Sequence, residues 1–209
     1  MSAPSAAADK VGVSRGLLVT VSVIVVGIVL GAGLGALSWH FWVLGLAGLV
    51  LGLGVGWSLA LLHAWLGSGR ALWLTVMPAA IAIVAGWAVL QTFEDAHQRQ
   101  AYRVALAETR AAETGLPPAE VKKLVAVGGL DYLAADGDEV LDAQVEKNIG
   151  FAGVAGRWLF RAEGGVRLAG GWRSGRALPV GIPGVIVANV LELAMAGFIT
   201  LRVVRRSVA

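Results

Sequence analysis

The sequence predicts an all-α integral membrane protein: four transmembrane helices, with a small, mostly helical extramembrane insert between the third and the fourth. The first observation behind this prediction is composition, because 57% of the 209 residues are hydrophobic and only 15% are charged, whereas about 25% are charged in soluble domains. The second observation is the presence of four long apolar runs. The third is charge distribution, since 12 of the 14 acidic and 11 of the 17 basic residues lie within residues 91–177.

Each apolar run is long enough to cross a membrane as a helix. A helix rises about 1.5 Å per residue and must cover a hydrocarbon core of about 30 Å. The first run is too long for the apolar part of a cleavable signal peptide, which has about 7–15 residues. Pro78 lies inside the third run, where neighbouring helices make a kink tolerable. The predicted spans are residues 16–37, 41–66, 71–90 and 178–201.

Basic residues beside the spans predict the orientation, because Lys and Arg are enriched on the cytoplasmic side. We expect a multi-pass protein of the bacterial cytoplasmic (inner) membrane, with a cytoplasmic N-terminal tail, residues 1–15, and a cytoplasmic basic tail, residues 202–209. The insert, residues 91–177, would then be extracytoplasmic. The flanking residues that fall on one side of this arrangement are Lys10, Arg15, Arg70, Arg202, Arg205 and Arg206.

Glycines form two copies of one pattern in the first two spans. The first copy is Gly27, Gly31 and Gly35, and each member is followed 21 residues later by its counterpart, Gly48, Gly52 and Gly56. Such faces allow the close backbone approach by which helices associate in lipid. Because a short turn makes the two spans antiparallel neighbours, we expect these glycine stripes (a glycine zipper) to pack the first hairpin against itself. A pore lining or an oligomer seam is the alternative. Gly33 and Gly54 lie off the stripes and would face a second neighbour, such as span three or four.

Polar side chains inside the spans are candidate site residues, because an ionisable group at membrane depth needs a partner or a role. Glu192 is the only charged residue of its span, and Asn189 lies three residues earlier on the same helix face. Counting from the span ends places Ser22, Ser58 and Thr75 in the inner half of their spans, where they can cluster with Glu192. Such a cluster is either a proton or cation site in a carrier or a hydrogen bond that joins helices.

The insert reads as a series of short elements. The third span is expected to continue as a helix to about Thr114, where Gly115 and two prolines stop it. A second helix is expected over 118–127, and a third from an Asp138 N-cap to about Lys147. A glycine turn at 163–165 predicts a β-hairpin of residues 158–162 and 166–169.

Acidic residues gather on the third of these helices, and we interpret them as a solvated face. A calcium loop requires glycine at its sixth position and glutamate at its twelfth, and after Asp136 these positions are Leu141 and Lys147. The acidic set is Asp136, Asp138, Glu139, Asp142 and Glu146.

The expected partners are the lipid bilayer and either a second copy of the chain or another membrane protein. Arginines near the ends of the fourth span are candidates for lipid phosphates: Arg173, Arg176, Arg202, Arg205 and Arg206. The net charge of +3 is small and lies beside the spans, so no nucleic-acid binding is expected.

The sequence contains no residue pattern typical of an enzyme or a metal site. It has no cysteine, which excludes disulfides, thiolate metal sites and cysteine nucleophiles. Its three histidines are too far apart in sequence to form a ligand pair, and no nucleophile elbow or phosphate-binding glycine loop occurs. We therefore expect neither catalysis, nor a metal, nor a cofactor.

The order of these parts resembles an uncharacterised family of bacterial multi-pass membrane proteins with a glycine-rich helical hairpin. The matching pieces are Gly27 to Gly56, Gly164-Gly165-Val166 to Gly171, and Leu191-Glu192, which together cover about half of the chain. The resemblance implies no enzyme activity and no known ligand. The leading expectation is a structural or interaction protein; the alternative is a small carrier or channel subunit that uses Glu192 and Asn189.

Overall fold

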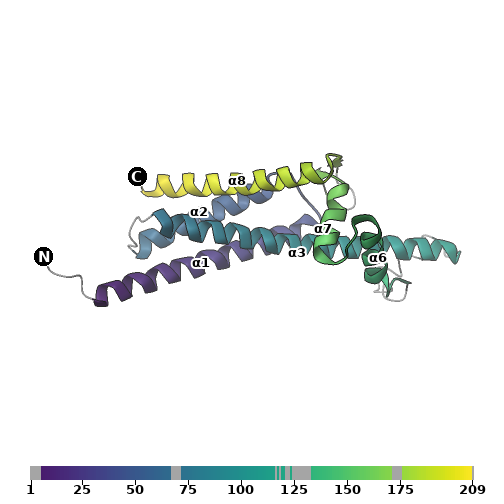
Figure 1. Cartoon of the computed structure of the whole chain (residues 1–209), viewed down its shortest axis with the longest axis horizontal. Helices are drawn as coiled ribbons and strands as arrows, with labels where there is room; N and C mark the ends of the chain where they lie inside the picture. Colours follow the sequence, from purple (N-terminus) through teal and green to yellow (C-terminus); the bar gives the residue numbers. More distant parts are fainter. Residues whose placement is uncertain are drawn as a thin grey trace.

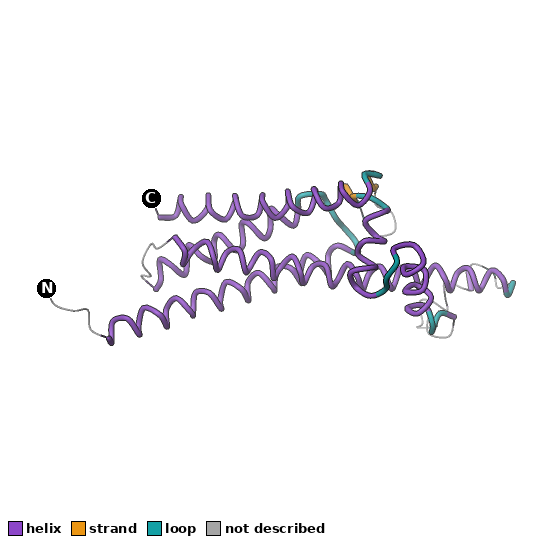
Figure 2. Tube along the Cα trace, viewed as in Figure 1, coloured by secondary structure: helices purple, strands orange, loops and turns teal. Residues whose placement is uncertain are grey.

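A computed structural model describes residues 6–66, 72–115, 117, 119–120, 123, 133–170 and 176–208 of the chain. The fold is mostly helical, and the two strands are short (Figure 2). Four helices are long and apolar enough to cross a membrane, as predicted, and the qualifying segments are Ser14–Ser38, Leu46–Trp65, Thr75–Glu113 and Gly181–Ser207. The second predicted insert helix, 118–127, and Arg173 fall largely or wholly outside the described residues.

The described elements, in chain order, are α1 (Ala6–Ser38), α2 (Leu46–Leu66), α3 (Leu72–Glu113), α6 (Gly137–Ile149), α7 (Gly153–Glu163), β1 (Val166–Ala169), β2 (Arg176–Leu178) and α8 (Gly181–Val208). The four long helices lie side by side, with both chain termini at one end (Figure 1). At the other end α3 runs on beyond its neighbours, and α6 and α7 lie against this extension.

The helix ends differ from the predicted span ends where the chain leaves its apolar runs. The first helix already begins at Ala6, and the last continues to Val208, so that most of each predicted tail is helical. Arginines in the last turn of α8 favour this continuation because cations stabilise a helix C-terminus. The second helix begins only at Leu46, after a connection that includes Gly45 with a φ of 87°. The third runs unbroken through Pro78 to Glu113, which confirms the predicted continuation into the insert.

The glycine stripes do not face each other, and the expectation of a self-packed hairpin is wrong. A Cβ placed on Gly27 or Gly31 would collide with the backbone of α3, at Ala82 and Gly86 respectively. A Cβ on Gly48 would stand 2.6 Å from the carbonyl oxygen of Glu192, in α8. Each stripe therefore gives one helix of the hairpin its own partner: α1 packs on α3, and α2 packs on α8.

The remaining stripe positions follow the same division. A Cβ on Gly35 would collide with the side chain of Phe93 in α3, and Gly52 and Gly56 lie against Ala196 and Thr200 in α8. Gly54, which lies off the stripe, is the position that faces α1, because a Cβ there would collide with Leu30. No described atom lies within 4 Å of a Cβ on Gly33. The hairpin helices are thus held apart by side chains, whereas the stripes allow direct backbone contact with α3 and α8.

The insert differs from its predicted hairpin. Residues 158–162 belong to α7 rather than to a strand, and β1 pairs with β2 in an antiparallel register that places Val166 opposite Leu178. The strand β1 also holds the connection between α1 and α2: Leu44 donates its N–H to the carbonyl of Leu168, and Gly170 donates to Trp42. The end of the helical hairpin is thus hydrogen-bonded to the insert.

Replacing Gly31 with valine tests the backbone contact between α1 and α3. The added side chain must displace the backbone of Gly86, and overpacking of this kind costs about 1–3 kcal/mol. We expect a lower thermal unfolding midpoint for Gly31→Val in detergent. Gly33→Val is the matched control, because it adds the same side chain one half-turn away in open space. An equal loss in both variants would contradict the contact.

Candidate functional site: the junction of the bundle and the insert

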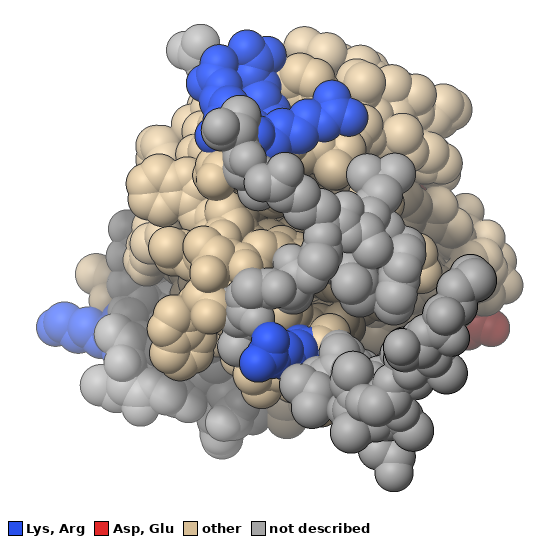
Figure 3. Space-filling model, turned by 90° about the vertical axis from the view of Figure 1, so that its left-hand side faces the viewer, with Lys and Arg blue, Asp and Glu red and all other residues tan. Residues whose placement is uncertain are grey.

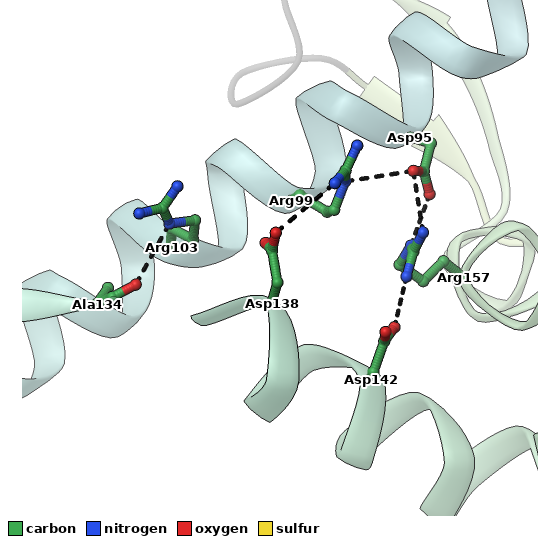
Figure 4. Close-up of polar contacts among 7 residues, drawn as sticks. All are labelled: Asp95, Arg99, Arg103, Ala134, Asp138, Asp142 and Arg157. Carbon is green, nitrogen blue, oxygen red and sulfur yellow. Dashed lines mark hydrogen bonds and ion pairs between the residues drawn. The ribbon is translucent and has the colours of Figure 1, made fainter. Parts of the chain in front are cut away.

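A buried arginine on α7 joins the insert to α3. The guanidinium of Arg157 donates from Nε to Oδ1 of Asp95 at 2.7 Å and from Nη1 to Oδ1 of Asp142 at 2.6 Å. The side chains of Arg157 and Asp95 are each only 9% exposed. Asp95 belongs to α3 and Asp142 to α6, so one side chain connects three helices (Figure 4). An arginine suits this position because its planar group donates several hydrogen bonds in fixed directions.

Further arginines along α3 hold the start of α6. Arg99 lies 3.3 Å from Asp95, four residues earlier on the same helix, and 3.6 Å from Asp138. Arg103 donates to the carbonyl of Ala134 at 3.3 Å (Figure 4). About two turns further on, Arg110 makes a two-pronged ion pair with Asp136, at 2.6 and 2.8 Å.

These contacts bear on two expectations about the acidic residues. Asp136, Asp138 and Asp142 point toward arginines of α3 and α7, while their side chains stay 45%, 49% and 36% exposed, so this side of α6 is a solvated face that also forms ion pairs. Asp138 is also not the N-cap: the helix begins at Gly137, preceded by Asp136, whose carboxylate is bound by Arg110 and makes no capping hydrogen bond. The exposed side of α6 retains Glu139 and Glu146.

The ion pairs shift the pKa values of Arg110, Asp136 and Arg157 toward the charged forms. The hydrogen bond from Arg110 holds the pKa of Asp136 below its ordinary value. Hydrogen bonds to Asp95 and then to Asp142 raise the pKa of Arg157, although burial acts in the opposite direction. Both shifts favour the charged forms of Asp136 and Arg157.

A cavity of about 250 Å³ lies beside this ionic junction. Its walls come from α3, α7, α8, the two short strands and the connection between α1 and α2. Its apolar lining includes Trp42 and Trp158, and the polar side chains that line it are Gln91, Glu94, Arg161, Asn189 and Glu192.

Glu192 and Asn189 both line this cavity, but they bind different groups. The Glu192 carboxylate accepts the backbone N–H of Gly45 at 2.6 Å, in the connection between α1 and α2. Asn189 accepts the indole N–H of Trp87 at 3.2 Å and donates to the carbonyl of Val185 at 2.8 Å. The contacts with Gly45 and Trp87 join α8 to other parts of the chain, whereas Val185 belongs to α8 itself.

The predicted cluster of Glu192 with hydroxyl groups is not formed. Glu192 lies at the level of Gly48, and Ser58 lies ten residues along α2, about 15 Å further from the insert. Ser58 donates instead to the carbonyl of Gly54, and Thr75 contacts the ring of His63 at 3.4 Å. Ser22 precedes the stripe of α1 and is also on the far side from the insert. The prediction placed Glu192 too near the end of the bundle that carries both termini, because it ended the fourth helix at residue 201 instead of Val208.

The predicted phosphate-binding arginines lie at opposite ends of α8. Arg202, Arg205 and Arg206 are exposed at the end that carries both termini, where Figure 3 shows several patches of Lys and Arg. Arg176 belongs to β2 at the insert end, and its side chain is outside the described residues. The two groups therefore cannot form one surface.

Sequence patterns did not single out the side chains that matter most at the junction. Arg157, Arg161, Gln91 and Glu94 belong to no recognisable motif. A signal was present in the spacing of Arg99, Arg103 and Arg110 on one side of a helix that leaves the membrane-length segment. Among the residues that the structure describes, no group of three or more His, Asp or Glu side chains could hold a metal ion.

Comparisons of the chain with protein-family models, curated proteins and solved structures find no match. The resemblance of its layout to a family of multi-pass membrane proteins stays a prediction. The junction supplies the observations that bear on function.

Removing the Arg157 guanidinium tests whether it holds the insert. Arg157→Gln removes the positive charge that pairs with the buried Asp95 carboxylate. Losing one partner of a buried ion pair lowers the free energy of unfolding by about 3 kcal/mol. We expect faster amide hydrogen exchange in α6 and α7, with α1 and α2 little changed. Arg99→Gln is the control, because that arginine is 40% exposed and surface pairs contribute about 0–1 kcal/mol. Equal exchange in the two variants would contradict the assignment.

Acidification tests the pair of Arg110 and Asp136. Because its pKa is lowered in the fold, Asp136 contributes stability above the ordinary aspartate pKa of about 3.9, and this contribution is lost as the pH falls further. The difference in thermal midpoint between the native chain and Asp136→Asn should therefore be largest at neutral pH and shrink in acid. The other carboxyl groups titrate in both proteins, so their effect on the thermal midpoint cancels in this difference. A difference independent of pH would contradict the ion pair.

Proposed function

We propose that the chain is a four-span membrane protein of structural or interaction type, which presents its insert in a fixed position at the membrane surface. The observation that carries this proposal is α3, which passes without a break from a membrane-length apolar segment into the part of the helix that binds α6 and α7. A continuous helix transmits position and orientation, whereas a flexible linker does not.

The distribution of basic residues supports an orientation for the proposal. Exposed Arg15, Arg202, Arg205 and Arg206 lie at the end opposite the insert. By the positive-inside rule this end is cytoplasmic and the insert is extracytoplasmic. A bacterial inner membrane with this topology would place the insert in the periplasm or outside the cell.

Exposed apolar side chains on the insert support an interaction role. Phe151 is 46% exposed and Val154 is 61% exposed, in the connection before α7 and in its first turn. Both lie outside the four apolar segments, where an apolar surface must meet either a partner or the membrane face. A protein partner is the occupant that we propose, because α7 is fixed by Arg157 and so presents these residues in one arrangement.

The carrier alternative has one observation in its favour, which is that Glu192 and Asn189 line the same cavity. Both side chains, however, make hydrogen bonds that connect α8 to its neighbours. These contacts support the structural role first.

Site-specific photo-crosslinking in cells tests the interaction role. A photoreactive amino acid at Val154 should yield a discrete protein adduct, whereas the same residue at Glu139, which is exposed on α6, should not. The adduct should weaken when Arg157→Gln is added, because the insert then loses its fixed position. Crosslinks only to lipid, or equal adducts at both positions, would contradict a protein partner at this surface.

A further inference from the structure

The polar side chains that line the cavity beside the junction lie at different levels along the bundle. Arg161 donates to Gln91 at 2.7 Å, and Gln91 lies one turn beyond Trp87 along α3, toward the insert. Trp87 marks the level of Asn189, and Glu192 lies three residues further along α8, away from the insert. With a rise of about 1.5 Å per residue, the levels of Arg161 and Glu192 differ by about 10 Å along the bundle.

Charged side chains line the cavity at two levels. The Arg161 guanidinium and the Glu94 carboxylate stand nearer the insert, and the Glu192 carboxylate stands further from it, with the Asn189 amide between. The Glu192 carboxylate accepts the N–H of Gly45, which fixes its orientation. The guanidinium suits an anionic group such as a carboxylate or phosphate.

The wall between these levels is largely apolar. It includes Trp42, Leu44 and Leu90 on one side and Val185 and Ala188 of α8 on another. Such a wall suits aliphatic atoms, and an indole face also attracts an ammonium group. The volume of about 250 Å³ is below the range of about 300–1,000 Å³ for drug-sized ligands, so the cavity fits a smaller molecule.

We propose that this cavity binds a small zwitterion, in which a primary ammonium is joined through a short aliphatic spacer to a carboxylate or phosphate. The ammonium binds Glu192, the anionic group binds Arg161, and the spacer lies along the apolar wall. This site is independent of the proposed presentation of the insert, because it uses neither Phe151 nor Val154.

Two sources supply this chemistry: a soluble amino acid or amino phosphoester, and the headgroup of an ethanolamine phospholipid. Both carry an ammonium and an anion at the required ends. They differ in whether the ligand arrives from water or from the bilayer, and the experiment below separates them.

Three probes of equal chain length test the need for both charges. Calorimetric titration of the purified chain in detergent would use 6-aminohexanoate, hexylamine and hexanoate at millimolar concentration. We expect 6-aminohexanoate to bind at least tenfold more tightly than either singly charged probe. Equal binding of hexylamine and 6-aminohexanoate, or no binding of 6-aminohexanoate, would overturn the proposal.

Two variants assign the ends of the site. Glu192→Gln keeps the size and an oxygen that accepts the Gly45 N–H, but loses the charge, and Arg161→Gln removes the guanidinium. Each variant should weaken the binding of 6-aminohexanoate at least tenfold. The control variants Glu146→Gln and Arg205→Gln, at exposed positions, should leave its binding unchanged. Unchanged binding in both site variants would overturn the assignment. If Glu192→Gln does not fold, the three-probe comparison on the native chain still decides.

Nanodiscs distinguish the two sources. If the ligand is a lipid headgroup, discs of phosphatidylethanolamine should weaken 6-aminohexanoate binding relative to discs of phosphatidylglycerol. If the ligand is soluble, the two kinds of disc should give the same affinity. Either result supports a zwitterion site, and competition by phosphatidylglycerol alone would overturn it.

Discussion

Direct contact between helix backbones at glycine is the constraint on which the rest of the structure depends. In lipid, helices gain little from hydrophobic burial against each other, so close packing and weak backbone contacts must hold them together. Here that contact occurs where Gly31 meets Gly86 and where Gly48 meets the carbonyl of Glu192. Each contact fixes one long helix relative to the hairpin, and together they position α3 and α8, the two helices that frame the cavity and lead into the insert.

The ionic junction extends this order beyond the apolar segments. Arg157 is effective because its charge is buried together with the Asp95 carboxylate and because it reaches both Asp95 and the more exposed Asp142 by short hydrogen bonds. Burial without such geometry would destabilise the fold, since desolvation of an ion costs several kcal/mol. The same α3 that carries Gly86 also carries Asp95, so helix packing and docking of the insert act through one rigid element.

Local sequence patterns predicted the four long helices and the continuation of α3, because each depends on residues close together in the sequence. They also predicted which glycines share a face. They could not predict the helix that the face meets, since several apolar helices offer equivalent partners and the choice depends on the whole bundle. The partner of Glu192 is a backbone N–H, which every residue except proline carries, so no side-chain pattern could identify it. The misassigned strand at 158–162 shows that a short apolar run before glycines is also compatible with a helix.

The central claim is that glycine backbones of different helices are in contact, and distances between these backbones in a bilayer test it most directly. The glycines concerned are far apart in sequence, so a short distance between them reports helix packing. Solid-state NMR on protein labelled with carbon-13 glycine should give a cross-peak between Gly31 and Gly86, which are in backbone contact. A self-packed hairpin would instead give cross-peaks between Gly31 and Gly52 and between Gly27 and Gly56. The first pattern is the one that the observed packing predicts, and the second would contradict it.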